Sequence, residues 1–295
     1  MIAQERAAFI GLGVMGFPMA GHLAEAGFEV TVFNRTSSRA ELWLETYAGR
    51  QASSPAEAAR DADIVLTCVG NDEDVRAVTT GPGGVLEGIR AGAILVDHTT
   101  ASADLAEELE AAAKDRGAGF LDAPVSGGQA GAEQGILTVM VGGQEEIFLR
   151  AEPILRTYAR RVALLGPAGS GQRTKMVNQI AIAGLLQGLS EALHFAKAAG
   201  LDPTAVVDVI SKGAAQSWQM ENRAQTMIDG EFDHGFAVEW MQKDLGIALA
   251  EAKRHGAHLP VTALIDQFYG EVAALGGRRW DTSSLIQRLE RLRGN

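Results

Sequence analysis

The feature that most constrains the fold is a glycine-rich turn directly behind the first apolar segment. Residues 7–10 have the composition of a short strand, residues 11–16 fit the pattern G-x-G-x-x-G, and residues 15–26 have the apolar spacing of a helix. In such a strand–turn–helix unit the first glycine permits a tight turn, the second lets the backbone approach a pyrophosphate, and the third lets helix and strand pack closely. The pattern predicts a dinucleotide site formed by Gly11, Leu12, Gly13, Val14, Met15 and Gly16. A glycine-rich turn without a ligand and a methyltransferase-type nucleotide site are the alternatives.

The predicted secondary structure of the chain changes near residue 165. Before it, strand-like segments at 28–33, 63–69, 93–96, 119–121 and 137–141 alternate with helix-like segments at 40–47, after Asp72, at 103–114 and at 145–155. This alternation predicts an α/β domain with a parallel sheet covered on both faces. Residues 174–199 then contain no turn signal before Gly200, and further helical segments follow at 203–212, 219–228, 238–255, 260–275 and 283–292. We expect two domains, residues 1–165 and 166–295, the second all-helical.

Composition excludes several classes of protein. The 295 residues contain 26 Lys+Arg and 37 Asp+Glu, a net charge of −11, which disfavours a non-specific nucleic-acid binder. No apolar run reaches the roughly 18–20 residues that span a bilayer, and the start of the chain does not resemble a signal peptide. The sequence has one cysteine, Cys68, so an intrachain disulfide cannot form. We therefore expect a reducing compartment and a cytoplasmic protein without nucleic-acid or membrane partners.

The segment after the second strand predicts the choice of coenzyme. An acidic residue at this position would bind the ribose 2′-hydroxyl of NAD and repel a 2′-phosphate. This chain has Asn34, Arg35 and Thr36 instead, followed by Arg39. The planar fork of Arg35 suits a phosphate. We therefore predict that NADP(H) is preferred over NAD(H); the alternative is a solvated polar loop that accepts either.

Two further clusters are candidate substrate sites. Ser126, Gly127 and Gly128 follow a strand, where exposed backbone N–H groups could bind a carboxylate; a plain turn is the alternative. Later, Lys175 begins a mostly apolar helix, and Asn178 and Gln179 share its face. A snorkelling surface lysine is the alternative interpretation of Lys175.

Two other patterns match phosphate-binding or metal-binding motifs only in part. Gly166 and Gly171 have the spacing of a phosphate-binding P-loop, but Gln172 stands where that motif needs lysine. His255 and His258 have no convincing third ligand, so no metal is expected.

Four motifs together resemble the β-hydroxyacid dehydrogenase family, which includes the 3-hydroxyisobutyrate dehydrogenases and several semialdehyde reductases. They are G-L-G-V-M-G-F-P-M at 11–19, D-A-P-V-S-G-G at 122–128, G-S-G-Q-R-T-K-M-V-N at 169–178 and Q-K-D-L-G-I-A-L-A at 242–250. The resemblance implies a doubly wound Rossmann-type domain, a long linking helix and an all-helical domain. It also implies a site role for several residues: Lys175 as acid/base, Ser126, Gly127 and Gly128 on the substrate carboxylate, Asn178 orienting the substrate, and Val69, Thr100 and Lys243 near the coenzyme.

The chain also departs from the family pattern. Val69-Gly70 replaces a common Leu-Pro, Ala101 stands in a segment that often contains proline, and Gln179 stands where some relatives have asparagine. These departures leave open the substrate and which of Asn178 and Gln179 contacts it.

The resulting prediction is an NADP(H)-dependent oxidoreductase that transfers hydride between nicotinamide and a small 3-hydroxy acid or semialdehyde. Within that class, tartronate semialdehyde or glyoxylate/succinic semialdehyde reduction and serine 3-dehydrogenation are alternatives to 3-hydroxyisobutyrate oxidation. A non-catalytic dinucleotide-binding sensor and an imine reductase are the rival classes, and Lys175 argues against both. The long apolar helix predicts a homodimer or homotetramer.

Overall fold

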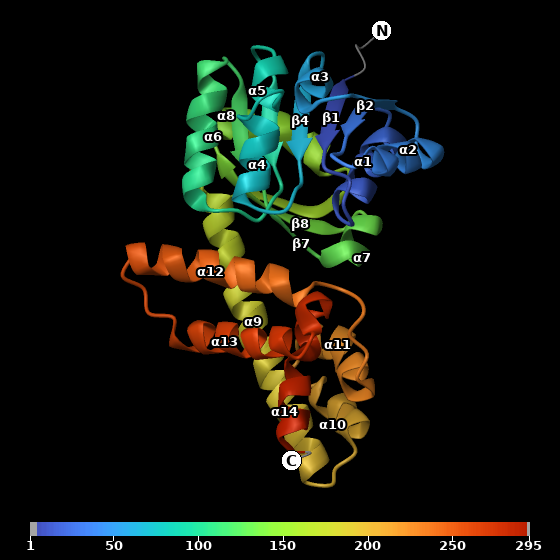
Figure 1. The fold of residues 1–295 in the computed structure, drawn as a ribbon, viewed down its shortest axis with the longest axis vertical. Helices are drawn as coiled ribbons and strands as arrows, with labels where there is room; N and C mark the ends of the chain where they lie inside the picture. Colours follow the sequence, from blue (N-terminus) through green and yellow to red (C-terminus); the bar gives the residue numbers. More distant parts are fainter. Residues whose placement is uncertain (1–4, 294–295) are drawn as a thin grey trace. The chain divides into compact units, whose positions relative to one another are not determined.

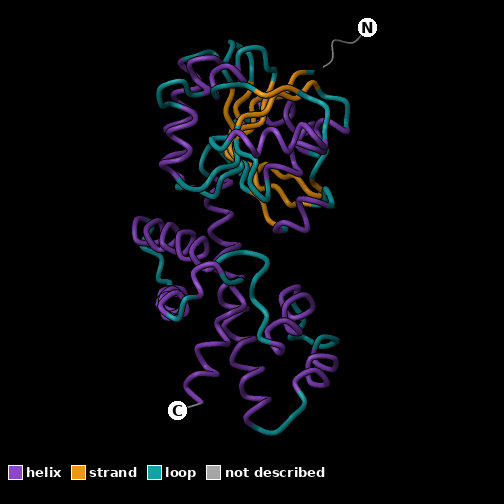
Figure 2. The backbone as a smooth tube through the Cα atoms, turned by 45° about the vertical axis from the view of Figure 1, so that its right-hand side comes forward, coloured by secondary structure: helices purple, strands orange, loops and turns teal. Residues whose placement is uncertain are grey.

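The computed structural model describes residues 5–293, which form two compact units that divide between Lys175 and Met176. The division falls inside one helix, α9 (Ser170–Ala198). Strands occur in the first unit, whereas the described part of the second unit is helical apart from one isolated β-bridge (Figures 1 and 2). The predicted fold class, an α/β sheet domain followed by a long helix and a helical region, is therefore present.

The sheet of the first unit has the strand order β3-β2-β1-β4-β5-β6-β8-β7, with β9 paired to β8. The strands are β1 (Arg6–Ile10), β2 (Glu29–Phe33), β3 (Arg50–Gln51), β4 (Ile64–Thr67), β5 (Ile94–Asp97), β6 (Gly119–Asp122), β7 (Val125–Ser126), β8 (Leu137–Gly143) and β9 (Ala159–Leu164). Pairing is parallel from β3 to β6, as predicted, but β8 runs antiparallel to β6 and β7. β7 continues in the direction of β6 along β8, and the chain then reverses in residues 127–136, which include α7 (Gly128–Glu133). Because the chain turns back here instead of crossing over a face of the sheet, β8 is antiparallel.

Alternating side chains of each central strand enter two different cores. In β1, Ala7 and Phe9 contribute to one core and Ala8 and Ile10 to the other. The first core includes side chains of α1 (Gly16–Glu25), α2 (Ser37–Thr46) and α8 (Glu145–Leu155). The second includes side chains of α3 (Pro55–Ala59), α4 (Asp72–Thr79), α5 (Val85–Gly88) and α6 (Ala103–Asp115). Burial on both faces explains why these strands are continuously apolar.

The helical unit packs its helices around the second part of α9. The helices are α10 (Pro203–Ile210), α11 (Trp218–Asp229), α12 (Val238–Arg254), α13 (Pro260–Ala274) and α14 (Leu285–Arg293). One core joins Ala183 and Leu186 of α9 to Leu245 of α12 and Tyr269 of α13. No helix in residues 5–293 is long and apolar enough to cross a bilayer.

Candidate active site

The predicted coenzyme segments of the first unit gather at one edge of the sheet. β2, β1, β4, β5 and β6 are consecutive parallel neighbours, so the loops that follow them leave from the same, carboxyl edge. Those loops carry residues 11–16, 34–36, Val69 and Thr100. Ser126, Gly127 and Gly128 lie slightly farther along, at the end of β7. The carboxyl edge is where doubly wound sheets bind their ligands.

The three glycines of the first turn differ in what surrounds them. Gly11 has φ +98°, and a Cβ there would lie 2.3 Å from the Cys68 carbonyl oxygen. A Cβ on Gly16 would lie 1.9 Å from the Gly11 carbonyl oxygen, so the start of α1 packs closely on the turn. A Cβ on Gly13 would meet no atom within 4 Å. The turn is therefore closely packed at Gly11 and Gly16, whereas the space next to Gly13 is open. This geometry fits a pyrophosphate that approaches the backbone at Gly13.

Asn34, directly after β2, forms a hydrogen bond with this turn. The Leu12 N–H donates to Asn34 Oδ1 at 2.9 Å, and Asn34 Nδ2 donates to the Thr36 carbonyl oxygen at 3.0 Å. The Arg35 side chain is 88% exposed, and its Nη1 lies 3.2 Å from Asp74 Oδ1 on α4. The exposed guanidinium has further donors that face solvent and could bind a phosphate.

The ends of β4 and β5 are joined by hydrogen bonds to Thr99 and Asp97. The Val69 N–H donates to Thr99 Oγ1 at 3.0 Å. Asp97 Oδ1 accepts from the Thr67 hydroxyl at 2.7 Å and from the Thr99 N–H at 3.1 Å. Burial raises the pKa of Asp97 to about 6, against the opposing effect of these hydrogen bonds.

A second buried carboxylate, Asp122 at the end of β6, holds the start of α9. Its Oδ1 accepts from the Gly169 N–H and its Oδ2 from the Gln172 N–H, both at 2.8 Å. A Cβ on Gly171 would lie 2.4 Å from the Met140 carbonyl oxygen, so the helix begins in close contact with β8. Burial raises the pKa of Asp122, and the backbone hydrogen bonds act in the opposite direction. The carboxylate suits this place because a helix N-terminus has unpaired N–H groups and a positive dipole end.

Lys175 follows one turn after Gln172 and is 7% exposed. This burial argues against the alternative of a snorkelling surface lysine. A lysine in the first turns of a helix that starts at the carboxyl edge of a dinucleotide-type sheet is a candidate to donate or accept a proton.

In the helical unit, three predicted residues belong to one polar chain. Asn178 Nδ2 donates to Gln179 Oε1 at 2.8 Å, and Gln179 Nε2 donates to Asp244 Oδ2 at 2.7 Å. Lys243 Nζ lies 3.2 Å from Asp244 Oδ1 and 5.8 Å from the centroid of the Trp240 ring. Sequence reasoning missed Asp244, whose side chain is 1% exposed. The sequence feature that could have identified it is an acidic residue among the apolar positions of the predicted helix 238–255.

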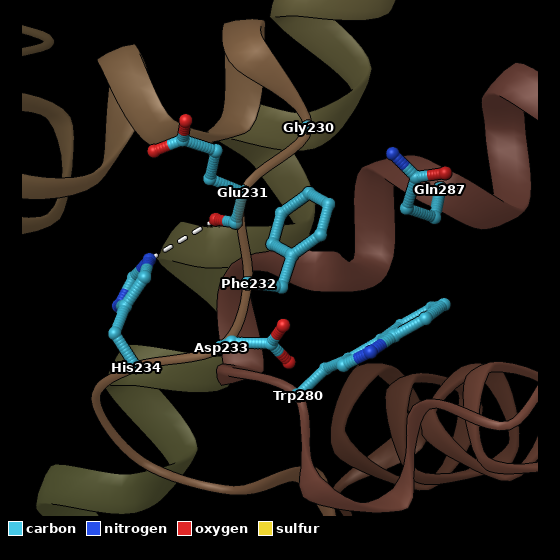
Figure 3. Close-up of a pocket in the computed structure, with 7 residues that line it drawn as sticks. All are labelled: Gly230, Glu231, Phe232, Asp233, His234, Trp280 and Gln287. Atoms are coloured by element: carbon cyan, nitrogen blue, oxygen red, sulfur yellow. Dashed lines mark hydrogen bonds between the residues drawn. The ribbon is translucent and has the colours of Figure 1, made fainter.

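Two surface pockets lie away from these residues. One pocket, of about 520 Å³, lies in the helical unit. Figure 3 shows the residues that line it: Gly230, Glu231, Phe232, Asp233, His234, Trp280 and Gln287. A smaller one of about 180 Å³ lies in the first unit and is lined by Arg6, Ala7, Thr31, Arg50, Gln51, Ala52, Glu57, Ala58, Arg60, Asp61 and Ala62. Neither contains a residue predicted to bind coenzyme or substrate. Among the residues described here, no three His, Cys, Asp or Glu side chains are placed to hold a metal ion.

Comparisons with known proteins match both parts of the chain. Residues 6–166 match the NAD-binding domain of 6-phosphogluconate dehydrogenase, and residues 169–289 match the NAD-binding region of NADP-dependent 3-hydroxyisobutyrate dehydrogenase. An uncharacterized oxidoreductase of Shewanella frigidimarina is 62% identical over 98% of this chain and 100% of its own. The 2-hydroxy-3-oxopropionate reductase of Escherichia coli is 37% identical over 96% of both chains.

A solved structure agrees with these sequence matches. The 3-hydroxyisobutyrate dehydrogenase of Mycobacterium tuberculosis, solved with L-serine, has a TM-score of 0.88 and 32% identity over 97% of this chain and 99% of its own. The fold and these similarities define an NAD(P)-binding dehydrogenase or reductase that acts on CH–OH groups. The chain belongs to the 3-hydroxyisobutyrate dehydrogenase family of β-hydroxyacid dehydrogenases.

Proposed function

We propose that the protein is an NADP(H)-dependent oxidoreductase that interconverts a small 3-hydroxy acid and its semialdehyde, with Lys175 as the acid/base. The observation that carries this proposal is the burial of Lys175, one turn after a helix start that Asp122 fixes to the carboxyl edge of the sheet. A sensor protein would not need a buried lysine there. The dehydrogenase named for 3-hydroxyisobutyrate and the reductase named for 2-hydroxy-3-oxopropionate support this substrate class.

In this proposal the coenzyme lies along the carboxyl edge. The backbone at Gly13 and the start of α1 hold the pyrophosphate. Arg35 and Thr36 hold the 2′-phosphate. Val69 and Thr100 lie beside the nicotinamide, and Lys243 contacts the coenzyme. The bound nicotinamide supplies the hydride chemistry.

The substrate contacts follow from its expected carboxylate. The backbone N–H groups near Ser126, Gly127 and Gly128 bind the carboxylate, and Asn178 with Gln179 orients the rest of the molecule. In the direction of reduction the Lys175 ammonium stabilises the developing alkoxide and donates its proton. In the direction of oxidation the neutral amine takes the hydroxyl proton.

Lys175→Ala tests this role. General acid–base catalysis contributes about 10²–10⁴-fold, so we expect kcat/KM to fall by about 10³-fold or more. The Kd for NADPH, measured by fluorescence titration, should stay within about threefold because the coenzyme contacts remain. The exposed Lys212→Ala is the matched control. A Lys175→Ala enzyme with a rate within about tenfold of wild type would remove Lys175 from the mechanism.

The coenzyme preference is tested at Arg35. A hydrogen-bonded charge contributes about 1.5–3 kcal/mol, so Arg35→Ala should lower kcat/KM for NADPH by about 10–100-fold and leave NADH nearly unaffected. Arg116→Ala, an exposed arginine elsewhere in the same unit, is the control. Equal effects of Arg35→Ala on both coenzymes, or a wild-type preference for NADH, would contradict the NADP(H) proposal.

The substrate within the class needs a direct comparison. Serine 3-dehydrogenation is a second candidate because the M. tuberculosis relative was solved with L-serine. Initial rates with 3-hydroxyisobutyrate, serine, glyoxylate and a panel of semialdehydes, each with NADP(H) and NAD(H), distinguish the candidates. The highest kcat/KM identifies the substrate and the favoured direction.

We also propose a homodimer or homotetramer in the cytoplasm. Val177, Leu185 and Phe195 of α9 are 65%, 47% and 68% exposed, an unusual amount of apolar surface for a helix of a monomer. Light scattering should give at least twice the chain mass of 31.1 kDa, and a monomer would contradict the proposal.

A further inference from the structure

One buried amide, Gln172, joins separate segments of the first unit. Its Nε2 donates to the Thr99 carbonyl oxygen at 2.7 Å, and its Oε1 accepts from the Ala101 N–H at 3.0 Å. The side chain therefore pairs with the backbone on both sides of Thr100. Gln172 is 1% exposed, and neither of these partners lies on its own helix.

The hydrogen bonds around Gln172 form one connected set. Thr99, whose carbonyl oxygen accepts from Gln172, also accepts from the Val69 N–H through its hydroxyl at 3.0 Å. The Gln172 N–H donates to Asp122 at the end of β6. Gln172 thus connects the ends of β4, β5 and β6 to the first turn of α9. In chain order these segments are about 25 residues or more apart.

Resting on the proposed function, we infer that Gln172 is a positioning residue: its side-chain amide fixes Lys175 relative to the Thr99–Ala101 backbone. Lys175 lies three positions later on the same helix. Positions i and i+3 lie on the same face of a helix. A shift of the first turn of α9 therefore moves the amine. A misplacement of about 1 Å can cost about 10²-fold in rate.

The geometry separates this role from a simple packing role. A leucine fills nearly the same volume as glutamine but leaves the Thr99 carbonyl oxygen and the Ala101 N–H unpaired. A glutamate matches the shape and retains an acceptor for the Ala101 N–H. Only its protonated form can also donate to the Thr99 carbonyl oxygen.

The first experiment compares Gln172→Leu with wild type. We expect kcat to fall by about 30–100-fold, with the Kd for NADPH within about threefold, because the glycine turn and Arg35 are untouched. Arg173→Gln is the matched control, since Arg173 is the next residue but pairs with Glu107 on the helix surface. We expect its kcat to stay within about twofold of wild type.

The second experiment uses Gln172→Glu over a range of pH. The introduced carboxyl would be buried beside Asp122, which accepts from the same residue, and Asp122 interacts with Asp97 on β5. Burial and these carboxyls favour the protonated form, while Lys175 on the same helix opposes this. We expect kcat of Gln172→Glu to approach wild type at pH 6, and to fall toward the Gln172→Leu value wherever the carboxyl ionises.

The outcomes separate this inference from the proposed function. Wild-type kcat in Gln172→Leu would overturn the positioning role, as would a Gln172→Glu enzyme no better than Gln172→Leu at every pH. Normal turnover in Lys175→Ala would overturn the proposed function instead. If Gln172→Leu does not fold, the pH dependence of Gln172→Glu decides: a ratio of its kcat to that of wild type that falls as the pH rises supports the inference, and a ratio that is the same at every pH overturns it.

Discussion

The two units bury carboxylates with different partners. In the first unit, Asp122 accepts from two backbone N–H groups at the start of α9. In the helical unit, Asp244 lies in the middle of α12 and contacts the side chains of Gln179 and Lys243. The carboxylates are 0% and 2% exposed as residues, so burial does not distinguish them.

The difference lies in which backbone donors remain available. A sheet edge and a helix start leave N–H groups without partners, and a carboxylate can satisfy several at once. Inside a helix every N–H is already used by the helix, so a buried carboxylate needs another side chain. Asp122 therefore completes the hydrogen bonding of the backbone, whereas Asp244 contacts other side chains, and another side chain can replace it. Three substitutions test this comparison.

The largest effect is expected at Asp122→Asn. The amide has one oxygen, so either the Gly169 or the Gln172 N–H loses its charged acceptor and faces an NH₂ group. We expect the free energy of unfolding to fall by about 2–4 kcal/mol in urea titrations. The exposed Asp115→Asn is the control. A loss below about 1 kcal/mol would show that the backbone donors do not need this carboxylate.

A smaller, pH-dependent effect is expected at Asp97→Asn. The folded carboxyl has a pKa of about 6 instead of 3.8, so it keeps a proton that the unfolded chain releases. This contribution to wild-type stability is full below about pH 4 and is lost as the pH rises through 6. Asparagine retains the single oxygen that accepts from Thr67 and Thr99 without ionising. We expect Asp97→Asn to be about 1–3 kcal/mol more stable at pH 7.5 and nearly equal to wild type at pH 4.

His98 provides the check on that pH dependence. Burial lowers its pKa to about 4, so its own effect has the opposite sign: stability is lost as the pH falls from about 6.5 to 4. Because His98 is present in both proteins, it cancels in the difference between them. A difference that does not change with pH would contradict the raised pKa of Asp97.

The smallest effect is expected at Asp244→Asn. An asparagine oxygen can still accept from Gln179 Nε2, and Lys243 is 21% exposed and can turn to water. We expect a loss of about 1 kcal/mol or less in the free energy of unfolding, with hydrogen exchange of α12 as the local measurement. A loss as large as that of Asp122→Asn would contradict the proposed difference between the buried carboxylates of the two units.

The sequence predicted the elements that have long periodic patterns. The glycine turn, the first strands and helices α8 to α14 are all near their predicted positions. It missed β3, β7, β9, α3, α5 and α7. All of these have six residues or fewer, too short for an apolar period, and β9 contains two exposed arginines, Arg160 and Arg161.

The candidate site was predictable where a backbone motif marks it. Gly11, Gly13 and Gly16 stand in a pattern whose geometry follows from the turn itself. Asp122, Gln172 and Asp244 were not assigned a role, because their partners are about 47 to 73 residues away in the chain. Such contacts depend on which strands and helices become neighbours, and no local pattern contains that information.

The most direct test of the account is a crystal structure of the protein with NADP⁺ and a bound 3-hydroxy acid. The account predicts the Lys175 Nζ about 2.6–3.2 Å from the substrate hydroxyl, with the Gln172 amide still paired to the backbone on both sides of Thr100. A Lys175 amine directed away from a correctly bound substrate, with another side chain at the hydroxyl, would contradict it.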